Sequence, residues 1–290
     1  MTNNIFKVMI IVFAMAFASC GDDESDNQLN LTFSGLEDLG SEYAYEGWIL
    51  VDGSPKSTGL FTVNGEGALS KSTFDLDKDD LEAATAFILT IEPSPDPDPA
   101  PSDVHILAGD FSSSSANLTV SHSAAIGTDF TSSTGGYILA TPTDSDDSNE
   151  NSGVWFLDPG AGPGAGLDLP TLPAGWAYEG WAVIDGTPVT TGTFTSVSGA
   201  DNAAPYSGSL PGPAYPGEDF LTNAPGGLTF PTDLRGTTIV VSVEPVPDNS
   251  PSPFTLKPLV GMTASDAADH TFLSMANNAA ATNPSGTATR

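Results

Sequence analysis

The chain has 290 residues, with 37 acidic against 7 basic residues and a formal net charge of −30 at pH 7. Such a surface repels phosphate backbones and anionic headgroups, which argues against nucleic acid as a partner. Charged residues make up only 15% of the chain and hydrophobic residues 39%, so the composition indicates a globular protein rather than an acidic disordered tail.

The first predicted element is a secretion signal over residues 1–19. Its apolar run at 8–18 is shorter than the ~20 residues that cross a bilayer. The run ends in the sequence FASC, whose Cys20 is the single cysteine of the chain. This ending is similar to the lipobox of bacterial lipoproteins, in which the cysteine is acylated and becomes the new N-terminus. We therefore expect lipid attachment at Cys20 and membrane association through that lipid, in the outer membrane and facing the periplasm or the cell surface.

Residues 20–30 are predicted to form an acidic tether, because the sequence GDDESDN at 21–27 offers no apolar side chain to bury. An acidic run behind a lipidated cysteine resembles the surface-export signal of one Gram-negative lineage. Surface export and simple spacing are both open at this point.

Two copies of one sequence pattern follow. YEGW at 45–48 returns at 178–181, and the DGSP turn at 52–55 returns as DGTP at the same spacing. A repeat of this length indicates a duplicated domain, since solenoid repeats have periods of about 20–50 residues. Asp-Gly supplies the positive φ angles of a two-residue hairpin turn, so each copy is expected to begin with a β-hairpin. The predicted strands are 43–51 and 57–63 in the first copy, and 176–184 and 190–197 in the second.

Each copy continues with an apolar strand that ends in Glu-Pro and leads into a proline-rich arm, at 94–102 and at 246–253. Prolines keep such an arm extended and outside the sheet interior. The repeated motif residues are Trp48, Glu92, Trp181 and Glu244. Together with Glu46 and Glu179, the repeated glutamates could hydrolyse glycosides as carboxylate pairs, or they could accept hydrogen bonds from turn amides and fix the arms. We favour the second interpretation, and we expect no catalytic residue and no enzymatic activity.

A further hairpin is predicted between the copies, with strands near 137–142 and 154–157 and an acidic loop at 144–151 between them. Hard oxygen ligands suit calcium, which makes Asp144, Asp146 and Asp147 a weak calcium candidate. A solvated acidic loop is the favoured alternative. No firm metal site and no other cofactor are expected.

The second copy is longer than the first because of extra residues within 200–235. Loops beyond about 12–15 residues tend to be functional or disordered. Tyr206, Tyr215 and Phe220 lie in this insertion and are candidate contacts for a sugar or a protein partner. The alternative is that these rings hold the insertion against the sandwich.

The predicted fold class is all-β, with two tandem antiparallel β-sandwich domains and long Pro-rich loops. Helices are confined to short pieces within 79–86 and 264–281. The expected organisation is a signal peptide at 1–19, a tether at 20–30, a first β domain at 31–157, a Gly/Pro linker at 158–172 and a second β domain at 173–290.

The order of these motifs resembles the C-terminal domain of the anti-sigma-K factor family, over 40–109 and again over 173–261. In that family this domain lies outside the cytoplasmic membrane, and sigma binding belongs to a separate cytoplasmic segment. Only the signal precedes Cys20, so we expect no sigma-binding segment in this chain. The resemblance and the sequence together predict a lipid-anchored envelope protein that binds an unknown protein or glycan or has a structural role. An extracytoplasmic sensory accessory and a carbohydrate-active enzyme are the alternatives.

Overall fold

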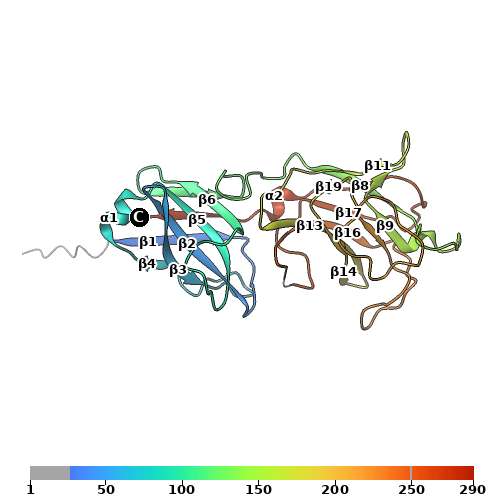
Figure 1. Ribbon diagram of the computed structural model, residues 1–290, viewed down its shortest axis with the longest axis horizontal. Helices are drawn as coiled ribbons and strands as arrows, with labels where there is room; N and C mark the ends of the chain where they lie inside the picture. The colour runs from blue at the N-terminus through green and yellow to red at the C-terminus, as the bar shows by residue number, and fades with distance from the viewer. Residues whose placement is uncertain (1–26, 249) are drawn as a thin grey trace, which may run out of the picture.

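The computed structural model describes residues 27–248 and 250–290, and it shows two β lobes arranged along the long axis of the molecule (Figure 1). The sheets are antiparallel, which confirms the predicted all-β class. Helix α1 (Lys78–Ala83) and helix α2 (Ala279–Thr282) are short and lie where helical pieces were predicted. Within the described residues, no helix has the length and apolar character needed to cross a membrane. The predicted signal peptide and Cys20 lie outside the described residues.

The first lobe is built around one eight-stranded sheet with the order β3-β2-β5-β6-β7-β20-β1-β4. Its edge strands β3 and β4 lie close to each other. The ring centroids of Phe61 on β3 and Phe74 on β4 are 6.3 Å apart. The sheet therefore curls around its own core. The strands are β1 (Gln28–Ser34), β2 (Tyr43–Val51), β3 (Ser54–Phe61), β4 (Thr73–Asp75), β5 (Ala86–Pro93), β6 (His105–Asp110), β7 (Ser115–Thr119) and β20 (Ser285–Thr289).

Strand β20 comes from the C-terminal end of the chain and lies between β7 and β1. Its buried residue Ala288 pairs with Leu31 on one side and with Ala116 on the other. The final residue, Arg290, donates from Nη1 to the carbonyl oxygen of Ala84 over 2.7 Å, just after α1. The expected domain at 173–290 is therefore not a separate unit, since its last strand belongs to the sheet of the first lobe.

The second lobe packs two sheets face to face, with the orders β14-β13-β16-β17-β19 and β12-β8-β9-β15; β18 also pairs with β8. Contacts between the layers include the rings of Phe156 and Phe194, whose centroids are 6.5 Å apart. The elements are β8 (Thr134–Leu139), the 3-10 turn η2 (Glu150–Ser152), β9 (Gly153–Trp155), β12 (Leu167–Asp168), β13 (Trp176–Ile184), β14 (Thr187–Phe194), β15 (Gly217–Asp219), β16 (Thr238–Pro245), β17 (Leu259–Met262), β18 (Leu273–Ser274) and β19 (Ala276–Asn277).

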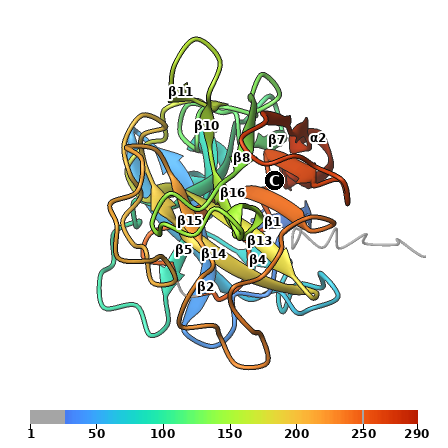
Figure 2. The ribbon, with the colours of Figure 1, turned by 90° about the vertical axis from the view of Figure 1, so that its right-hand side faces the viewer.

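The segment between the two copies also differs from its expected organisation. Strands β8 and β9 form the predicted hairpin, with Ile138 opposite Trp155, but they belong to the second lobe instead of the first domain. Part of the predicted linker at 158–172 is ordered as β10 (Leu157–Asp158) and β11 (Gly164–Ala165), a hairpin that projects from the lobe (Figure 2).

The two lobes share a continuous buried core. The ring of Phe130 meets the edge of the Tyr178 ring at a centroid distance of 6.4 Å. Gly175 packs so closely on the chain after the first arm that a Cβ there would lie 2.5 Å from the carbonyl oxygen of Asp103. The lobes are therefore packed against each other instead of being joined by a free linker.

The repeat is visible as two equivalent hairpins. Strands β2 and β13 begin and end where the sequence predicts, and their turns have positive φ at Asp52 and Asp185 (51° each), followed by glycines at 77° and 80°. These angles are those of the two-residue turn that Asp-Gly favours. The returning strands β3 and β14 start three residues earlier than predicted, directly after the turn.

Candidate functional site

In the first lobe, a chain of hydrogen bonds runs from Trp48 on β2 to the Pro-rich arm. The Trp48 indole Nε1 donates to Thr90 Oγ1 over 2.9 Å, and the Thr90 hydroxyl donates to the carboxylate of Glu92. The same Glu92 oxygen accepts the backbone N–H of Ser102 over 2.9 Å, at the far end of the arm. Because Glu92 is only 1% exposed, this network ties an exposed arm to the interior of the sheet.

The second lobe contains the same network. Trp181 Nε1 donates to Ser242 Oγ over 2.8 Å, and the Ser242 hydroxyl donates to Glu244. Glu244 Oε1 also accepts the backbone N–H of Phe254 over 2.9 Å, directly after the second arm. Both repeated glutamates thus have the arm-fixing geometry that the sequence analysis favoured over a catalytic pair.

The partner glutamates Glu46 and Glu179 lie one strand away and each accept a hydroxyl from the neighbouring strand, from Ser57 and Thr190. Burial raises the pKa of Glu179 to about 7 and that of Glu244 to about 8, and it also raises the pKa of Glu46. In the second lobe, the Oε2 atoms of Glu179 and Glu244 are buried without a hydrogen-bond partner. Two carboxyl groups of this lobe are therefore partly protonated at neutral pH.

The remaining residues of the YEGW motif also have packing roles. A Cβ at Gly47 would lie 2.4 Å from Thr58 Oγ1, and a Cβ at Gly180 would lie 2.3 Å from Thr191 Oγ1. Only glycine allows the neighbouring strand to approach this closely. The pairing with the neighbouring strand also shifts register directly after each glycine. The motif therefore builds the fold in both copies.

The insertion at 200–235 is held by the aromatic residues that were considered as partner contacts. Phe220 is completely buried, and its ring stacks on Tyr206 at a centroid distance of 5.9 Å. Both rings also contact Phe230, each at 5.5 Å. The Tyr215 hydroxyl donates to the carbonyl oxygen of Pro163 over 2.9 Å. These rings hold the insertion against the lobe, and Phe220 in particular has no surface to offer a partner.

Buried carboxylates anchor the same insertion, and the sequence analysis missed them. Asp219 Oδ1 accepts the indole N–H of Trp155 over 2.7 Å, and its Oδ2 accepts the backbone N–H of Thr143 over 2.8 Å. Burial raises the pKa of Asp219, and it raises the pKa of Glu218 and Asp201 to about 7. The signal in the sequence was an acidic pair directly before an aromatic residue, GEDF, inside a Pro/Gly-rich loop.

Two cavities lie along the insertion and share Ser207 and Gly208. One has a volume of about 360 Å³ and is lined by Trp155 and Asp201, and the other has a volume of about 680 Å³ and is lined by Asp144. Leu210 lines the first cavity and is 46% exposed. The insertion therefore offers a hollowed edge with the exposed Leu210, whereas Phe220 of its aromatic cluster is buried.

The acidic loop uses its carboxylates for its own turns. Asp144 accepts the backbone N–H of Asp146 over 3.1 Å and the side-chain amide of Asn149 over 2.7 Å. Asp146 accepts the backbone N–H of Ser148 over 3.0 Å, and Asp147 is exposed. Across residues 27–248 and 250–290, no group of three or more His, Cys, Asp or Glu side chains is placed to hold a metal ion. Calcium binding at this loop stays a prediction.

Comparison with known proteins gives a family match for the first copy. The model of the family described as "Anti-sigma-K factor rskA, C-terminal" matches residues 14–104, which include β1 to β5 and the first Pro-rich arm. No curated protein and no solved structure matches the chain. The first copy, which contains Trp48 and Glu92, is therefore similar to an anti-sigma-related family.

Proposed function

We propose that this protein is a non-enzymatic binding or structural lipoprotein of the bacterial envelope, anchored through Cys20 and carrying two anti-sigma-K-like copies. The observation that carries the proposal is the role of Glu92 and Glu244. Both are buried and fix an exposed arm in equivalent hydrogen-bond networks, which is the behaviour of a scaffold. A catalytic carboxylate pair would instead have to reach a substrate.

The partner surface that we propose is the hollowed edge of the insertion in the second lobe. It is specific to one copy, it is open to solvent, and it presents the half-exposed Leu210 beside polar groups of Asp201 and Ser207. Apolar side chains among polar neighbours are typical of protein and ligand contacts. The buried carboxylates and rings beneath this edge provide a rigid support for it.

A photo-crosslinking experiment on intact cells tests this proposal. A photoreactive residue is placed at Leu210, and Leu60 on β3 of the first lobe is the matched control, because both are leucines with nearly equal exposure (46% and 47%). We expect a reproducible cross-linked envelope partner from position 210 and none from position 60. Equal cross-linking at both positions, or at neither, contradicts the proposed surface.

The anchor is tested separately with Cys20→Ser. We expect the substitution to abolish incorporation of labelled fatty acid and to release the protein from the membrane fraction, because the acyl chains provide the membrane affinity. Retention of the variant in the outer membrane, with the label still incorporated, would disprove lipid attachment at this residue.

A second candidate function is an extracytoplasmic sensory accessory of an anti-sigma type system. The family match over residues 14–104 favours it, because that match names an anti-sigma factor domain. The same cross-linking experiment separates the two: an integral membrane regulator as the partner supports the sensory role, and a surface or extracellular partner supports the binding role.

A further inference from the structure

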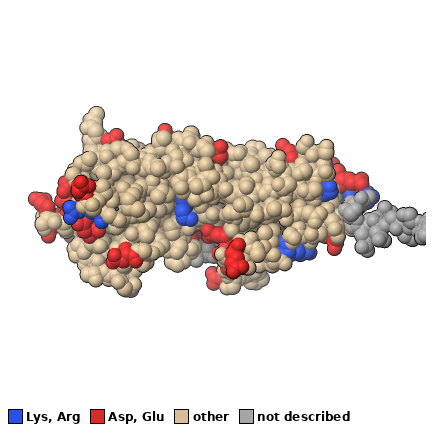
Figure 3. Space-filling model, turned by 180° about the vertical axis from the view of Figure 1, so that it is seen from behind, with Lys and Arg blue, Asp and Glu red and all other residues tan. Residues whose placement is uncertain are grey.

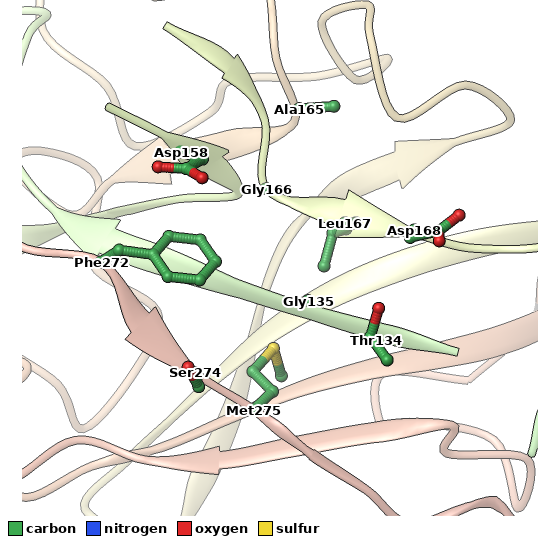
Figure 4. Close-up of a pocket in the computed structure, with 10 residues that line it drawn as sticks. All are labelled: Thr134, Gly135, Asp158, Ala165, Gly166, Leu167, Asp168, Phe272, Ser274 and Met275. Atoms are coloured by element: carbon green, nitrogen blue, oxygen red, sulfur yellow. The ribbon is translucent and has the colours of Figure 1, made fainter. Parts of the chain in front are cut away.

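A pocket of about 360 Å³ lies in the second lobe, where β12 and β18 flank β8 (Figure 4). In the order β12-β8-β9-β15, this pocket lies at the β12 end of the sheet, whereas β15 at the other end is part of the insertion. The pocket is therefore separate from the surface proposed above. Its lining residues are Thr134, Gly135, Asp158, Ala165, Gly166, Leu167, Asp168, Phe272, Ser274 and Met275.

Two glycines of β8 make this arrangement possible. A Cβ at Gly135 would lie 2.7 Å from Leu167 Cδ2, and a Cβ at Gly136 would lie 2.7 Å from Phe272 Cζ. Larger residues at these positions would push both flanking side chains away from β8. The β10–β11 hairpin contributes Asp158 to the pocket, so the Gly/Pro-rich segment forms one of its walls.

Three large apolar side chains line the pocket among its polar groups. Leu167 and Met275 are buried, and the ring of Phe272 is half-buried. Figure 4 shows the Phe272 ring, the Leu167 side chain and the Met275 sulfur around the middle of the pocket. Within residues 27–248 and 250–290, the Phe272 ring has no aromatic or cationic partner. The ring is thus available to a ligand.

The two ends of the pocket are acidic. Figure 4 shows Asp158 near Phe272 and Asp168 at the opposite end, and both are exposed. Asp158 Oδ1 accepts the backbone N–H of Gly160 over 2.9 Å, which leaves Oδ2 available. Asp168 has no hydrogen bond or ion pair within the part of the chain that the structure describes. Figure 3 shows acidic and basic side chains on one face of the molecule, and the chain has 37 acidic against 7 basic residues, so its surface as a whole attracts cations.

We propose that this pocket binds an organic cation, the ammonium or guanidinium group at the end of an alkyl chain. The alkyl stem packs against Leu167 and Met275, as the stems of Lys and Arg do on apolar surfaces. The cationic group contacts the face of Phe272 and either carboxylate. The large apolar side chains of the pocket are poor contacts for a hydrated metal ion. The two aspartates repel an anion. A Lys or Arg side chain of a partner protein and a free alkylamine share this chemistry.

This proposal does not depend on the lipid anchor or on the insertion. It is tested on the purified full chain with ¹³C-labelled methionine methyl groups. Met275 lines the pocket and is the reporter, whereas Met262 is 70% exposed, lies outside the pocket and is the internal control. The probes are Nα-acetyl-lysine amide and Nα-acetyl-arginine amide, and Nα-acetyl-norleucine amide is the uncharged analogue.

We expect saturable shifts of the Met275 methyl signal with the two cationic probes, with a dissociation constant on the order of 1 mM, and no shift at Met262. Norleucine amide should bind at least about tenfold more weakly. Raising the salt concentration should weaken binding of the cations, because part of the attraction is electrostatic and screened. The salt experiment needs no variant, so it tests the proposal on the native protein.

The variants identify the groups that bind. The combination Asp158→Asn with Asp168→Asn should weaken lysine amide binding about tenfold, and Phe272→Leu should weaken it severalfold. Asp266→Asn, at an exposed aspartate outside the pocket, should change nothing. Thermal melting checks that each variant is folded. Equal binding of norleucine amide, no shift of Met275 at 50 mM lysine amide (about 50-fold the expected constant), or an unaffected double variant overturns the proposal.

A final comparison separates the two sources of the cation. If a lysine-containing tetrapeptide binds more tightly than 1,5-diaminopentane, the pocket is adapted to a partner side chain. If the diamine binds more tightly, the pocket takes a free amine. If neither binds more tightly than norleucine amide, the pocket does not recognise organic cations.

Discussion

The first lobe completes its sheet with β20, a strand from the far end of the chain, whereas the second lobe covers its sheet with β8, β9 and β15. The repeated strands are the same in both lobes: a hairpin, a strand that ends in Glu-Pro, and the strand after the arm. Strands β8 and β9 come from the segment between the copies, β15 comes from the insertion in the second copy, and β20 follows the second copy. The comparison teaches that the repeated strands supply the shared scaffold, whereas the additions are specific to each lobe. In the second lobe these additions include the insertion, the projecting hairpin and the cation pocket.

The largest difference between the stabilities of the two lobes should appear when residues 284–290 are removed. Without β20, strands β1 and β7 lose a hydrogen-bonded partner each, and the Arg290 contacts at the end of α1 are also lost. We expect a loss on the order of 5 kcal/mol, comparable to the stability of a whole domain. Hydrogen exchange measured by mass spectrometry should show β1 and β7 exposed and β13 and β16 still protected.

The control for this truncation is Arg290→Ala, which leaves β20 in place and should cost far less. If the truncated chain keeps β1 and β7 protected, the first lobe does not depend on its C-terminal strand. If β13 and β16 lose protection as strongly as β1 and β7, the two lobes unfold as one unit. That result contradicts the expectation that the truncation destabilises the first lobe alone.

The next effect tests whether both copies have the same packing. Gly47→Ala and Gly180→Ala place a methyl group against Thr58 and Thr191 at less than 2.5 Å, so each should cost about 2–3 kcal/mol through overpacking. Gly65→Ala is the matched control, because its Cβ would meet no atom within 4 Å, and it should change stability by less than about 0.5 kcal/mol. Urea denaturation measures all three. A large cost in only one lobe would show that the repeat is equivalent in sequence but not in packing.

The pH dependence of stability should be larger in the second lobe, because, of the described carboxyl groups in the first lobe, burial raises only the pKa of Glu37, between β1 and β2, to about 7. Burial raises the pKa of Glu244 to about 8 in the folded state, above the value of about 4.3 in the unfolded chain. The folded protein therefore binds this proton more tightly, and the resulting stabilisation is complete below about pH 4.3 and is lost as the pH rises to about 8. Glu179, Asp201 and Glu218 add to the same trend, because burial raises the pKa of each to about 7.

Glu244→Gln removes the proton dependence at one site while it keeps the shape of the side chain. Relative to the wild type, the variant should gain on the order of 4 kcal/mol at pH 9 compared with pH 5. Melting curves across this pH range measure the effect, and Glu66→Gln at an exposed position is the control. A wild-type protein that becomes more stable from pH 5 to pH 9 would contradict the assignment.

Sequence patterns predicted those parts of the fold that local chemistry determines. The Asp-Gly turns, the strands β2 and β13 and the all-β class follow from turn angles and alternation along the chain. The position of β20 could not be predicted in this way, because its sequence SGTAT is polar and small, and only Ala288 is buried. Its pairing depends on the edges of β1 and β7, which are distant in sequence. Boundaries drawn from composition at 158–172 failed for the same reason.

The residues of the candidate sites also differ in how far the sequence predicts their roles. The roles of Glu92 and Glu244 were accessible from the repeat, because equal residues at equal spacing indicate equal geometry. The roles of the aromatic residues in the insertion could not be predicted, because composition alone does not distinguish a buried ring such as Phe220 from an exposed one. The pocket beside β8 combines residues near 135, 160 and 272, and only the sheet pairing brings them together.

The smallest expected difference in stability between the two lobes concerns the repeated tyrosine of the motif. Tyr45 donates to the carbonyl oxygen of Glu37 over 3.1 Å, and Tyr178 donates to that of Pro170 over 2.7 Å. Burial raises the pKa of both hydroxyls, so each stays a neutral donor at physiological pH. Replacement by Phe leaves the ring packing intact and removes one hydrogen bond, so each variant should lose about 1 kcal/mol. The shorter bond of Tyr178 predicts the larger loss. Urea midpoints at an unchanged m-value test this order, and a larger loss for Tyr45→Phe would show that the chain entering β2 is held more firmly by this bond than the chain entering β13.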